Sequence, residues 1–319
     1  MGISKAIAVT LAAQLSNPML PAGAIPSPRS LPISSTQPKP SRACAVPRGW
    51  EGVAEREPRF VIFGEVHGTQ QAPAFIGDLS CALAAQGKRI LVAVEHPSDL
   101  SAAYQHAWQL PETAFVQALS KAGWAQMDDG TGSEAMMAQL VRLHQLARRG
   151  GAIDVTPFNG MKNEAQAQQF AHLPGQGPHE AAQADNILRA ASSRPYDYVL
   201  VLVGNVHARK RPVHHSGVTF DPMARHLARH GRLVTLDMET AGGTAWSCQI
   251  KPDFKPQPGT PVTSDAVVCG PHAVGRIEQP DGPPFIALTD PTPAHHAADY
   301  DGTFWLGRVR SSPPAVTPD

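Results

Sequence analysis

The sequence lacks an excess of charge of either sign, since 27 lysines and arginines balance 27 aspartates and glutamates. Nucleic acids and acidic membranes select proteins with clustered positive charge, so neither is an expected partner. A long apolar run that could cross a bilayer is also missing, and the four cysteines show none of the close cysteine and histidine spacing of a structural zinc site. The expected partner is a small-molecule ligand or substrate, and the oligomeric state stays open.

Proline and glycine are abundant instead, with 31 and 27 residues, and long irregular segments are expected at the two ends. Residues 1–24 have the pattern of a signal peptide, with Lys5 before a short apolar stretch and small residues at Ala22-Gly23-Ala24. We therefore expect an exported protein, periplasmic or secreted. The expected organisation is a proline- and serine-rich linker over 25–51, a single α/β domain over 52–310 in which 240–310 supplies edge strands and loops, and a disordered tail over 311–319.

The cysteines bear on this expectation. Cys44, Cys81, Cys248 and Cys269 allow three complete disulfide pairings. Export favours a bond between Cys248 and Cys269, because both lie in a region of short strands that a bridge would stabilise. Cys81 lies in an apolar helical stretch, where a buried free thiol is expected.

Apolar runs alternate with helical patterns between Arg59 and Met238. The runs predict strands over 59–63, 90–95, 153–158, 198–203 and 233–238, and the patterns between them predict helices over 73–87, 102–122, 133–149 and 180–191, with a short one from 221. Runs that are apolar on both faces are typical of parallel strands covered by helices. We predict an α/β fold: a mostly parallel, doubly wound sheet flanked by helices in three layers, with a small C-terminal extension of strands and loops that includes a last strand within 300–307.

Two of the predicted strands end in the same Gly-x-x-His pattern, Gly64-Glu65-Val66-His67 and Gly204-Asn205-Val206-His207, and a third ends in Glu95-His96. The carboxyl ends of parallel strands open on one rim of the sheet, where ligands of such folds usually bind. We therefore expect a site there. Its expected catalytic residues are Glu65, His67, Glu95 and His207, and its expected substrate-binding residues are His96, Asn159, Asn205 and Arg209.

Two kinds of chemistry suit these residue types. In the first, His67 takes a proton from water, Glu65 and Glu95 orient its ring, and His207 polarises the bond under attack. In the second, Glu65, His67, Glu95 and His207 hold a divalent metal ion that lowers the pKa of bound water. The sequence does not choose between them. The pairs His214-His215 and His295-His296 are expected in surface loops.

The motifs 64–68, Glu95 and 204–208, in this order, resemble the superfamily that links erythromycin-esterase-like hydrolases, ChaN-like haem-binding proteins and the TraB/Tiki group. The resemblance covers about 59–238, and it implies an α/β fold with Glu65, His67, Glu95 and His207 at active-site positions. Similar families carry an arginine and an acidic residue in the helix before the last motif. Here His179-Glu180 stands at that point, so the arginine is absent and Glu180 keeps the place of the acid.

The leading hypothesis is an exported hydrolase-like enzyme, of esterase or metallopeptidase type, that activates water with these glutamates and histidines and is assisted by a metal in one version. The alternative is a non-catalytic haem- or metal-binding protein of iron uptake, as the ChaN-like branch of the resemblance implies.

Overall fold

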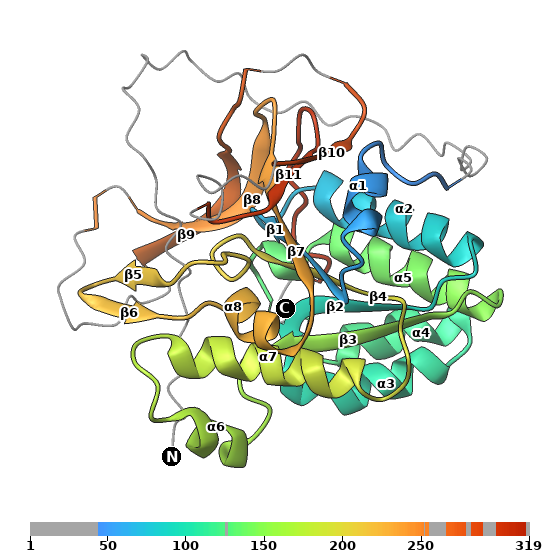
Figure 1. Cartoon of the computed structure of the whole chain (residues 1–319), viewed down its shortest axis with the longest axis horizontal. Coiled ribbons are helices and arrows are strands. Elements are labelled where there is room, and N and C mark those ends of the chain that lie inside the picture. Colours follow the sequence, from blue (N-terminus) through green and yellow to red (C-terminus); the bar gives the residue numbers. More distant parts are fainter. Residues whose placement is uncertain are drawn as a thin grey trace. The chain divides into compact units, whose positions relative to one another are not determined.

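Seven strands form the central sheet, in the order β10-β11-β7-β1-β4-β2-β3 (Figure 1). The computed structural model describes residues 44–124, 127–251, 253–254, 266–278, 282–289 and 298–316. These belong to one compact unit, Cys44–Gln249 with Cys269–Asp319, apart from the few described residues of a second unit within Ile250–Val268. Two further sheets have two strands each, β5 with β6 and β8 with β9.

All neighbouring strands of the central sheet run parallel except β10 and β11, which are antiparallel. The predicted mostly parallel sheet is therefore confirmed, and so is the small C-terminal extension. The strands are β1 (Phe60–Glu65), β2 (Ile90–Pro97), β3 (Ile153–Asn159), β4 (Tyr198–Gly204), β5 (Val213–His215), β6 (Val218–Phe220), β7 (Leu233–Glu239), β8 (Thr244–Ile250), β9 (Val267–Ala273), β10 (Phe285–Leu288) and β11 (Gly302–Trp305).

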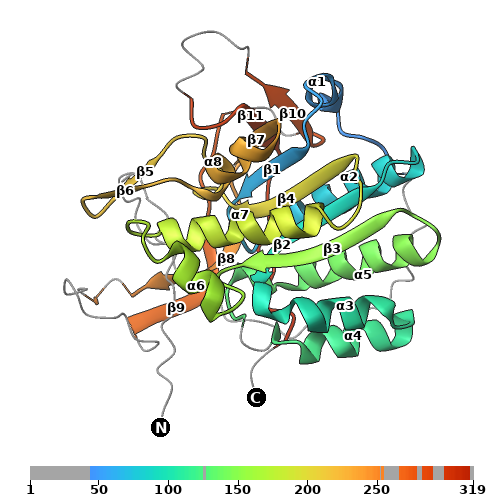
Figure 2. The ribbon, with the colours of Figure 1, turned by 60° about the horizontal axis from the view of Figure 1, so that its bottom comes forward.

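Helices cover both faces of the sheet (Figure 2). They are α1 (Trp50–Glu55), α2 (Gln71–Ala85), α3 (Ser101–Gln109), α4 (Glu112–Lys121), α5 (Glu134–Arg148), α6 (Glu164–Phe170), α7 (Gly177–Ala191) and α8 (Met223–Leu227), with short 3-10 turns at Ser98–Leu100, Gly130–Gly132 and Ala228–His230. Among these helices, no span is long and apolar enough to cross a bilayer within the residues that the structure describes.

The alternation of side chains along β1 explains the three layers. Val61 and Phe63 join one buried cluster with residues of α2 and α5, whereas Phe60 and Ile62 join a second cluster with residues of α7 and α8. Successive side chains of a strand point to opposite faces, so a strand that is apolar throughout needs a helical layer on each side.

Two disulfides are present. Cys248 bonds Cys269, as predicted. Cys44 bonds Cys81, so the expectation of a free thiol at Cys81 is wrong. An apolar helical stretch identifies a buried face, but it does not show that a segment 37 residues earlier in the chain reaches that face. Disulfides persist mainly in oxidising compartments.

Three stretches differ from the simple sequence prediction. Residues 311–316, for which a disordered tail is predicted, run beside the loop after β1, where Ser312 N–H donates to the Gly68 carbonyl at 2.8 Å. The exposed His214 and His215 lie on β5 of a hairpin and not in an irregular loop. The signal peptide, most of the linker and His295-His296 lie outside the described residues, and the predicted domain boundaries stay predictions.

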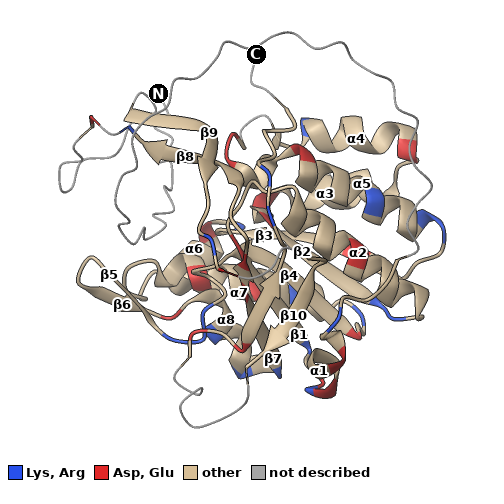
Figure 3. Ribbon diagram, turned by 90° about the horizontal axis from the view of Figure 1, so that it is seen from above, with Lys and Arg blue, Asp and Glu red and all other residues tan. Residues whose placement is uncertain are grey.

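Acidic and basic residues are interspersed over the described helices and loops (Figure 3). This distribution agrees with the balanced composition.

Candidate functional site

The carboxyl ends of β1, β4 and β2 lie side by side, because β4 pairs with β1 on one side and with β2 on the other. Glu65 is the last residue of β1 and is the register partner of Gly204, the last residue of β4. His67 and His207 follow these two ends within three residues. Glu95 lies near the end of β2, where the register against β3 shifts. Irregularities of this kind re-aim side chains at strand ends.

Five side chains at this rim form one continuous chain of contacts. His67 Nδ1 lies 3.0 Å from Glu65 Oε1, and His67 Nε2 lies 3.1 Å from Glu95 Oε2. Beyond Glu95, its Oε1 lies 3.5 Å from His207 Nε2, and His207 Nδ1 lies 2.7 Å from Glu180 Oε1. The structure thus brings the four predicted catalytic residues together and adds Glu180 from α7. We call these five residues the Glu/His chain.

The two ends of the Glu/His chain are its most deeply buried residues, and the two imidazoles between them are more exposed. The side chains of Glu65 and Glu180 are each 2 % exposed, whereas His67 is 19 % exposed and His207 is 11 % exposed. Glu180 is held further by the Met223 N–H, which donates to its Oε2 at 2.7 Å. Each imidazole therefore has its Nδ1 fixed by a buried carboxylate, while its Nε2 faces the more accessible Glu95.

Glycine at position 204 makes this convergence possible. A Cβ atom there would lie 3.1 Å from His67 Nε2 and 3.4 Å from His207 Cδ2, which is closer than most real contacts of this kind. The Gly204 N–H also donates to Glu95 Oε2 at 2.7 Å and so fixes the shared carboxylate. At Gly68 the φ angle is +81°, and a side chain there would strike the Trp246 carbonyl at 2.0 Å. Only glycine lets the backbone turn away from the site at that point.

Charge favours the protonated form of both imidazoles. Burial acts to lower the pKa of His207, but the charges of Glu180 and Glu95 outweigh it and raise this pKa to about 9. For His67, burial again acts downward, and the charge of Glu95 with the hydrogen bond to Glu65 raises the pKa well above its ordinary value. Burial acts to raise the pKa of Glu95, yet the two histidines lower it to about 2. Glu65, held by one histidine only, has a pKa that burial raises.

A divalent metal ion does not fit these residues as they are arranged. All four ring nitrogens of His67 and His207 already have a carboxylate oxygen within 3.5 Å. In the part of the chain that the structure describes, no group of three or more His, Cys, Asp or Glu side chains is placed to hold a metal ion. A metal would have to break the chain of contacts before it could bind.

Three of the four tyrosines do not offer a free hydroxyl to haem. The Tyr104 hydroxyl contacts His96 Nδ1 and accepts from Trp124 Nε1 at 3.2 Å. The Tyr196 hydroxyl donates to Asp154 and the Tyr300 hydroxyl donates to the Asn205 carbonyl. These hydroxyls are therefore engaged within the protein.

The expected substrate-binding residues have different surroundings. His96 is fully buried, with its Nδ1 against Tyr104 and its Nε2 2.8 Å from the Thr131 carbonyl, and burial lowers its pKa to about 4. Neither ring nitrogen of His96 is left for a ligand. Asn159 Oδ1 accepts from Gln183 Nε2 at 2.9 Å, and Arg209 Nε lies 3.8 Å from Asp299.

Asn205 belongs to a second polar group on the same rim. Its carbonyl accepts from Tyr300, and its side chain hydrogen-bonds Asp237 on β7. Burial is the main reason why the pKa of Asp237 is raised to about 6. Asp237 cannot be identified from the sequence, because an aspartate inside an otherwise ordinary strand carries no local motif.

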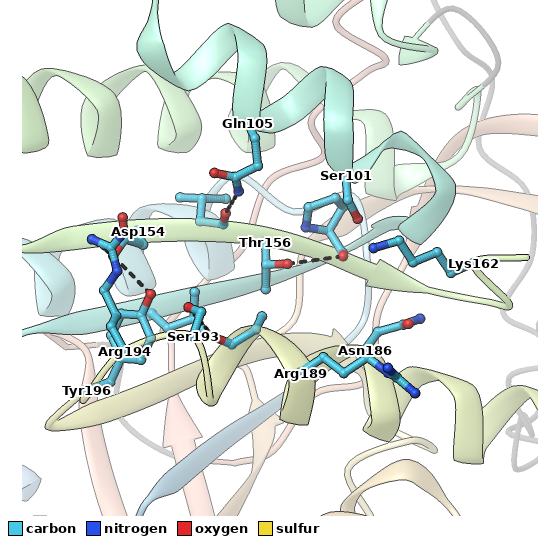
Figure 4. Close-up of a pocket in the computed structure, with 14 residues that line it drawn as sticks. Ser101, Gln105, Asp154, Thr156, Lys162, Asn186, Arg189, Ser193, Arg194 and Tyr196 are labelled. Atoms are coloured by element: carbon cyan, nitrogen blue, oxygen red, sulfur yellow. Dashed lines mark hydrogen bonds and ion pairs between the residues drawn. The ribbon is translucent and has the colours of Figure 1, made fainter. Parts of the chain in front are cut away.

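Two surface concavities lie away from the Glu/His chain. One, of about 370 Å³, lies beside the edge strand β3 between α3 and α7, where Figure 4 shows Gln105, Thr156 and Asn186 around it. The Gln105 amide caps the edge carbonyl of Val155 at 3.1 Å, and Arg194 pairs with Asp154 at 3.2 Å. Its edge carbonyl and one of its cations are thus already engaged, so this groove offers no comparable chemistry.

Comparison with known proteins gives a fold but no family. No family profile and no curated protein matches the sequence. A variant of the erythromycin esterase EreC in its open conformation superposes with a TM-score of 0.55 at 13% identity, over 85% of this chain and 95% of that chain. The chain shares the fold of that esterase.

Two other solved structures also match. A Bacillus cereus protein has a TM-score of 0.54 at 10% identity, over 83% of this chain and 93% of that chain. Haem-binding ChaN of Campylobacter jejuni has a TM-score of 0.39 at 13% identity, over 60% of this chain and 86% of that chain, which is too low to carry an argument. The predicted resemblance to the esterase is confirmed at the level of the fold.

Proposed function

We propose that this protein is a hydrolase that cleaves an ester of a small molecule at the Glu/His chain. The observation that carries the proposal is the pair of imidazoles with Nδ1 anchored on separate buried carboxylates and Nε2 turned toward one carboxylate that they share. An imidazole held in this way by a carboxylate is the arrangement that general acid and base catalysis needs. The ester class is taken from the esterase whose fold the chain shares.

His67 is the base in this proposal. It is the most accessible of the two imidazoles. To accept a proton from water, His67 Nε2 has to be deprotonated and has to release Glu95, which stays in place because the Gly204 N–H still holds it. Glu65 stabilises the charge that the ring gains, because a buried carboxylate favours the imidazolium form.

His207 is the acid. With a pKa of about 9 it keeps its proton near neutral pH, and it can donate from Nε2 to the oxygen that leaves the substrate. The reaction therefore needs His67 neutral and His207 charged. We expect a bell-shaped dependence of kcat/KM on pH, with its optimum on the alkaline side of neutrality because both pKa values are raised.

A panel of aryl and alkyl esters tests the proposal, with amides and phosphates for comparison. His67→Ala and His207→Ala should each lower kcat/KM by roughly 100-fold or more, which is typical of the loss of a proton-transfer group. His215→Ala on the exposed hairpin is the matched control and should leave it unchanged. Full activity of either rim variant, or no hydrolysis of any ester by the wild type, would refute the proposal.

We propose in addition that the protein is exported, which the two disulfides support. Protein recovered from the medium or periplasm of a secreting host should then have no free thiols when it is denatured and treated with a thiol reagent. Retention in the cytosol with free thiols would contradict export.

A further inference from the structure

His179 lies beside the Glu/His chain without belonging to it. It is in the first turn of α7, immediately before Glu180, and its ring centroid is 5.9 Å from that of His207 at an interplanar angle of 41°. The proposed function leaves this third imidazole without a role. Its hydrogen bonds indicate one.

Gln183 determines which nitrogen of His179 carries the proton. Gln183 is fully buried one turn further along α7, and its Nε2 lies 3.1 Å from His179 Nε2 and 2.9 Å from Asn159 Oδ1. An amide nitrogen has two hydrogens and no acceptor capacity, so it donates one hydrogen to each partner. His179 Nε2 is therefore an acceptor, and a neutral ring has its hydrogen on Nδ1. No described residue accepts a hydrogen bond from that Nδ1.

The charge state supports this arrangement. Burial lowers the pKa of His179, and the neighbouring charge of His207 lowers it further. Together these two effects outweigh the charges of Glu180 and Glu95, which act to raise it. The ring is therefore uncharged under conditions where His67 and His207 carry protons on both nitrogens. A neutral imidazole N–H can polarise an oxygen atom by hydrogen bonding without giving up its proton.

We propose that His179 is a substrate-binding residue that donates a hydrogen bond from Nδ1 to an oxygen atom of the substrate, and that Gln183 and Asn159 are positioning residues that keep the ring hydrogen on that nitrogen. The proposal rests on the proposed ester hydrolysis, in which the carbonyl oxygen gains negative charge during attack by water. A donor already in position stabilises that charge more in the transition state than in the ground state. Asn159 thereby acts through Gln183 and His179 and does not itself contact the substrate.

The tautomer can be measured without a substrate. In a two-bond proton–nitrogen correlation spectrum of the whole chain, His179 is assigned by the loss of its signals in His179→Gln. Near neutral pH its ring should show hydrogen on Nδ1 only. In Gln183→Glu the carboxylate accepts where the amide donated, so the hydrogen should move to Nε2. Gln183→Met removes the amide at similar length and should give a mixture of tautomers.

Catalysis gives a second, independent readout on an ester that the panel identifies. Gln183→Glu should lower kcat by roughly 100-fold with little change in KM, as loss of one donor to the developing charge does. His179→Asn carries an amide N–H near the position of Nδ1 and should keep more activity than His179→Gln, whose amide reaches the position of Nε2.

The two readouts separate the possible failures. Hydrogen on Nε2, or a charged His179 ring near neutral pH, would overturn the inference even if esters are hydrolysed. Equal activity of His179→Asn and His179→Gln would overturn it as well. If the wild type hydrolyses no ester, the proposed function and the substrate-binding role of His179 both fall, while the tautomer still tests the hydrogen-bond assignment.

Discussion

Glu95→Gln should lower the pKa values of two histidines at once, because Glu95 is the only one of the three carboxylates in the Glu/His chain that contacts both rings. The rise in the pKa of His207 from the ordinary 6.5 to about 9 corresponds to about 3 kcal/mol of preference for the charged ring. Glu180 contributes the larger share, since its contact of 2.7 Å is shorter than the 3.5 Å contact with Glu95. Loss of the Glu95 charge should therefore remove about 1 kcal/mol of the preference of His207 for its charged form. It should affect His67 more, because the charge of Glu95 is the largest influence that raises its pKa.

The assay is a titration of the histidine ring signals by nuclear magnetic resonance, with His67→Ala and His207→Ala as assignment variants. Glu65→Gln and Glu180→Gln are the matched controls, because each has a direct contact with one ring only. Glu65→Gln should lower mainly the pKa of His67, and Glu180→Gln mainly that of His207. The reasoning is refuted if Glu95→Gln leaves either pKa in place, or if each control moves both histidines equally.

The remaining predictions concern stability and packing. Because the pKa of His207 is raised in the folded state, the stabilisation that its charged ring provides is complete below pH 6.5 and is lost as the pH rises through about 9. Urea denaturation should therefore give a lower free energy of unfolding at alkaline pH. A free energy of unfolding that does not change with pH would contradict this. Gly204→Ala should lower ester hydrolysis by roughly 100-fold, because the new methyl group displaces the rings of His67 and His207, while thermal stability changes little. Gly275→Ala is the control: its Cβ meets open space, so both activity and stability should stay unchanged. Cys44→Ser with Cys81→Ser opens a loop of 37 residues and should cost about 4 kcal/mol on the chain-entropy view, measured in the same urea assay; a loss below about 1 kcal/mol would argue that the unfolded chain is already constrained.

Much of the fold follows from local pattern. Each strand of the parallel core is a short apolar run, and each neighbouring helix has a matching apolar face, so strand and helix can be assigned without knowledge of their partners. Helix α5 illustrates the precision that is possible, since the predicted range begins at Ser133, and Ser133 is the N-cap that accepts the Met136 N–H. The hairpin of β5 and β6 and the helix α6 are short, and the patterns of so few residues are ambiguous.

The site at the rim of the sheet can be predicted from the sequence only in part. A parallel sheet obliges the residues after β1, β2 and β4 to share one edge, so Glu65, His67, Glu95 and His207 can be grouped from sequence alone. Which nitrogen meets which oxygen depends on rotamers and on the register shift in β2, and these are set by packing. Neighbouring side chains of a strand point to opposite sides, so Glu95 reaches the rim while His96 lies in the interior.

What the sequence alone determined is the set of elements and the edge at which chemistry gathers, because strand period and chain direction are properties of neighbouring residues. The tertiary structure decided the pairing of His207 with Glu180, the bond from Cys44 to Cys81 and the hydrogen bond from Gln183 to Asn159. The first two join residues that lie 27 and 37 positions apart, and the third joins α7 to β3. Such contacts depend on how helices rotate and dock on the sheet, which no local pattern encodes.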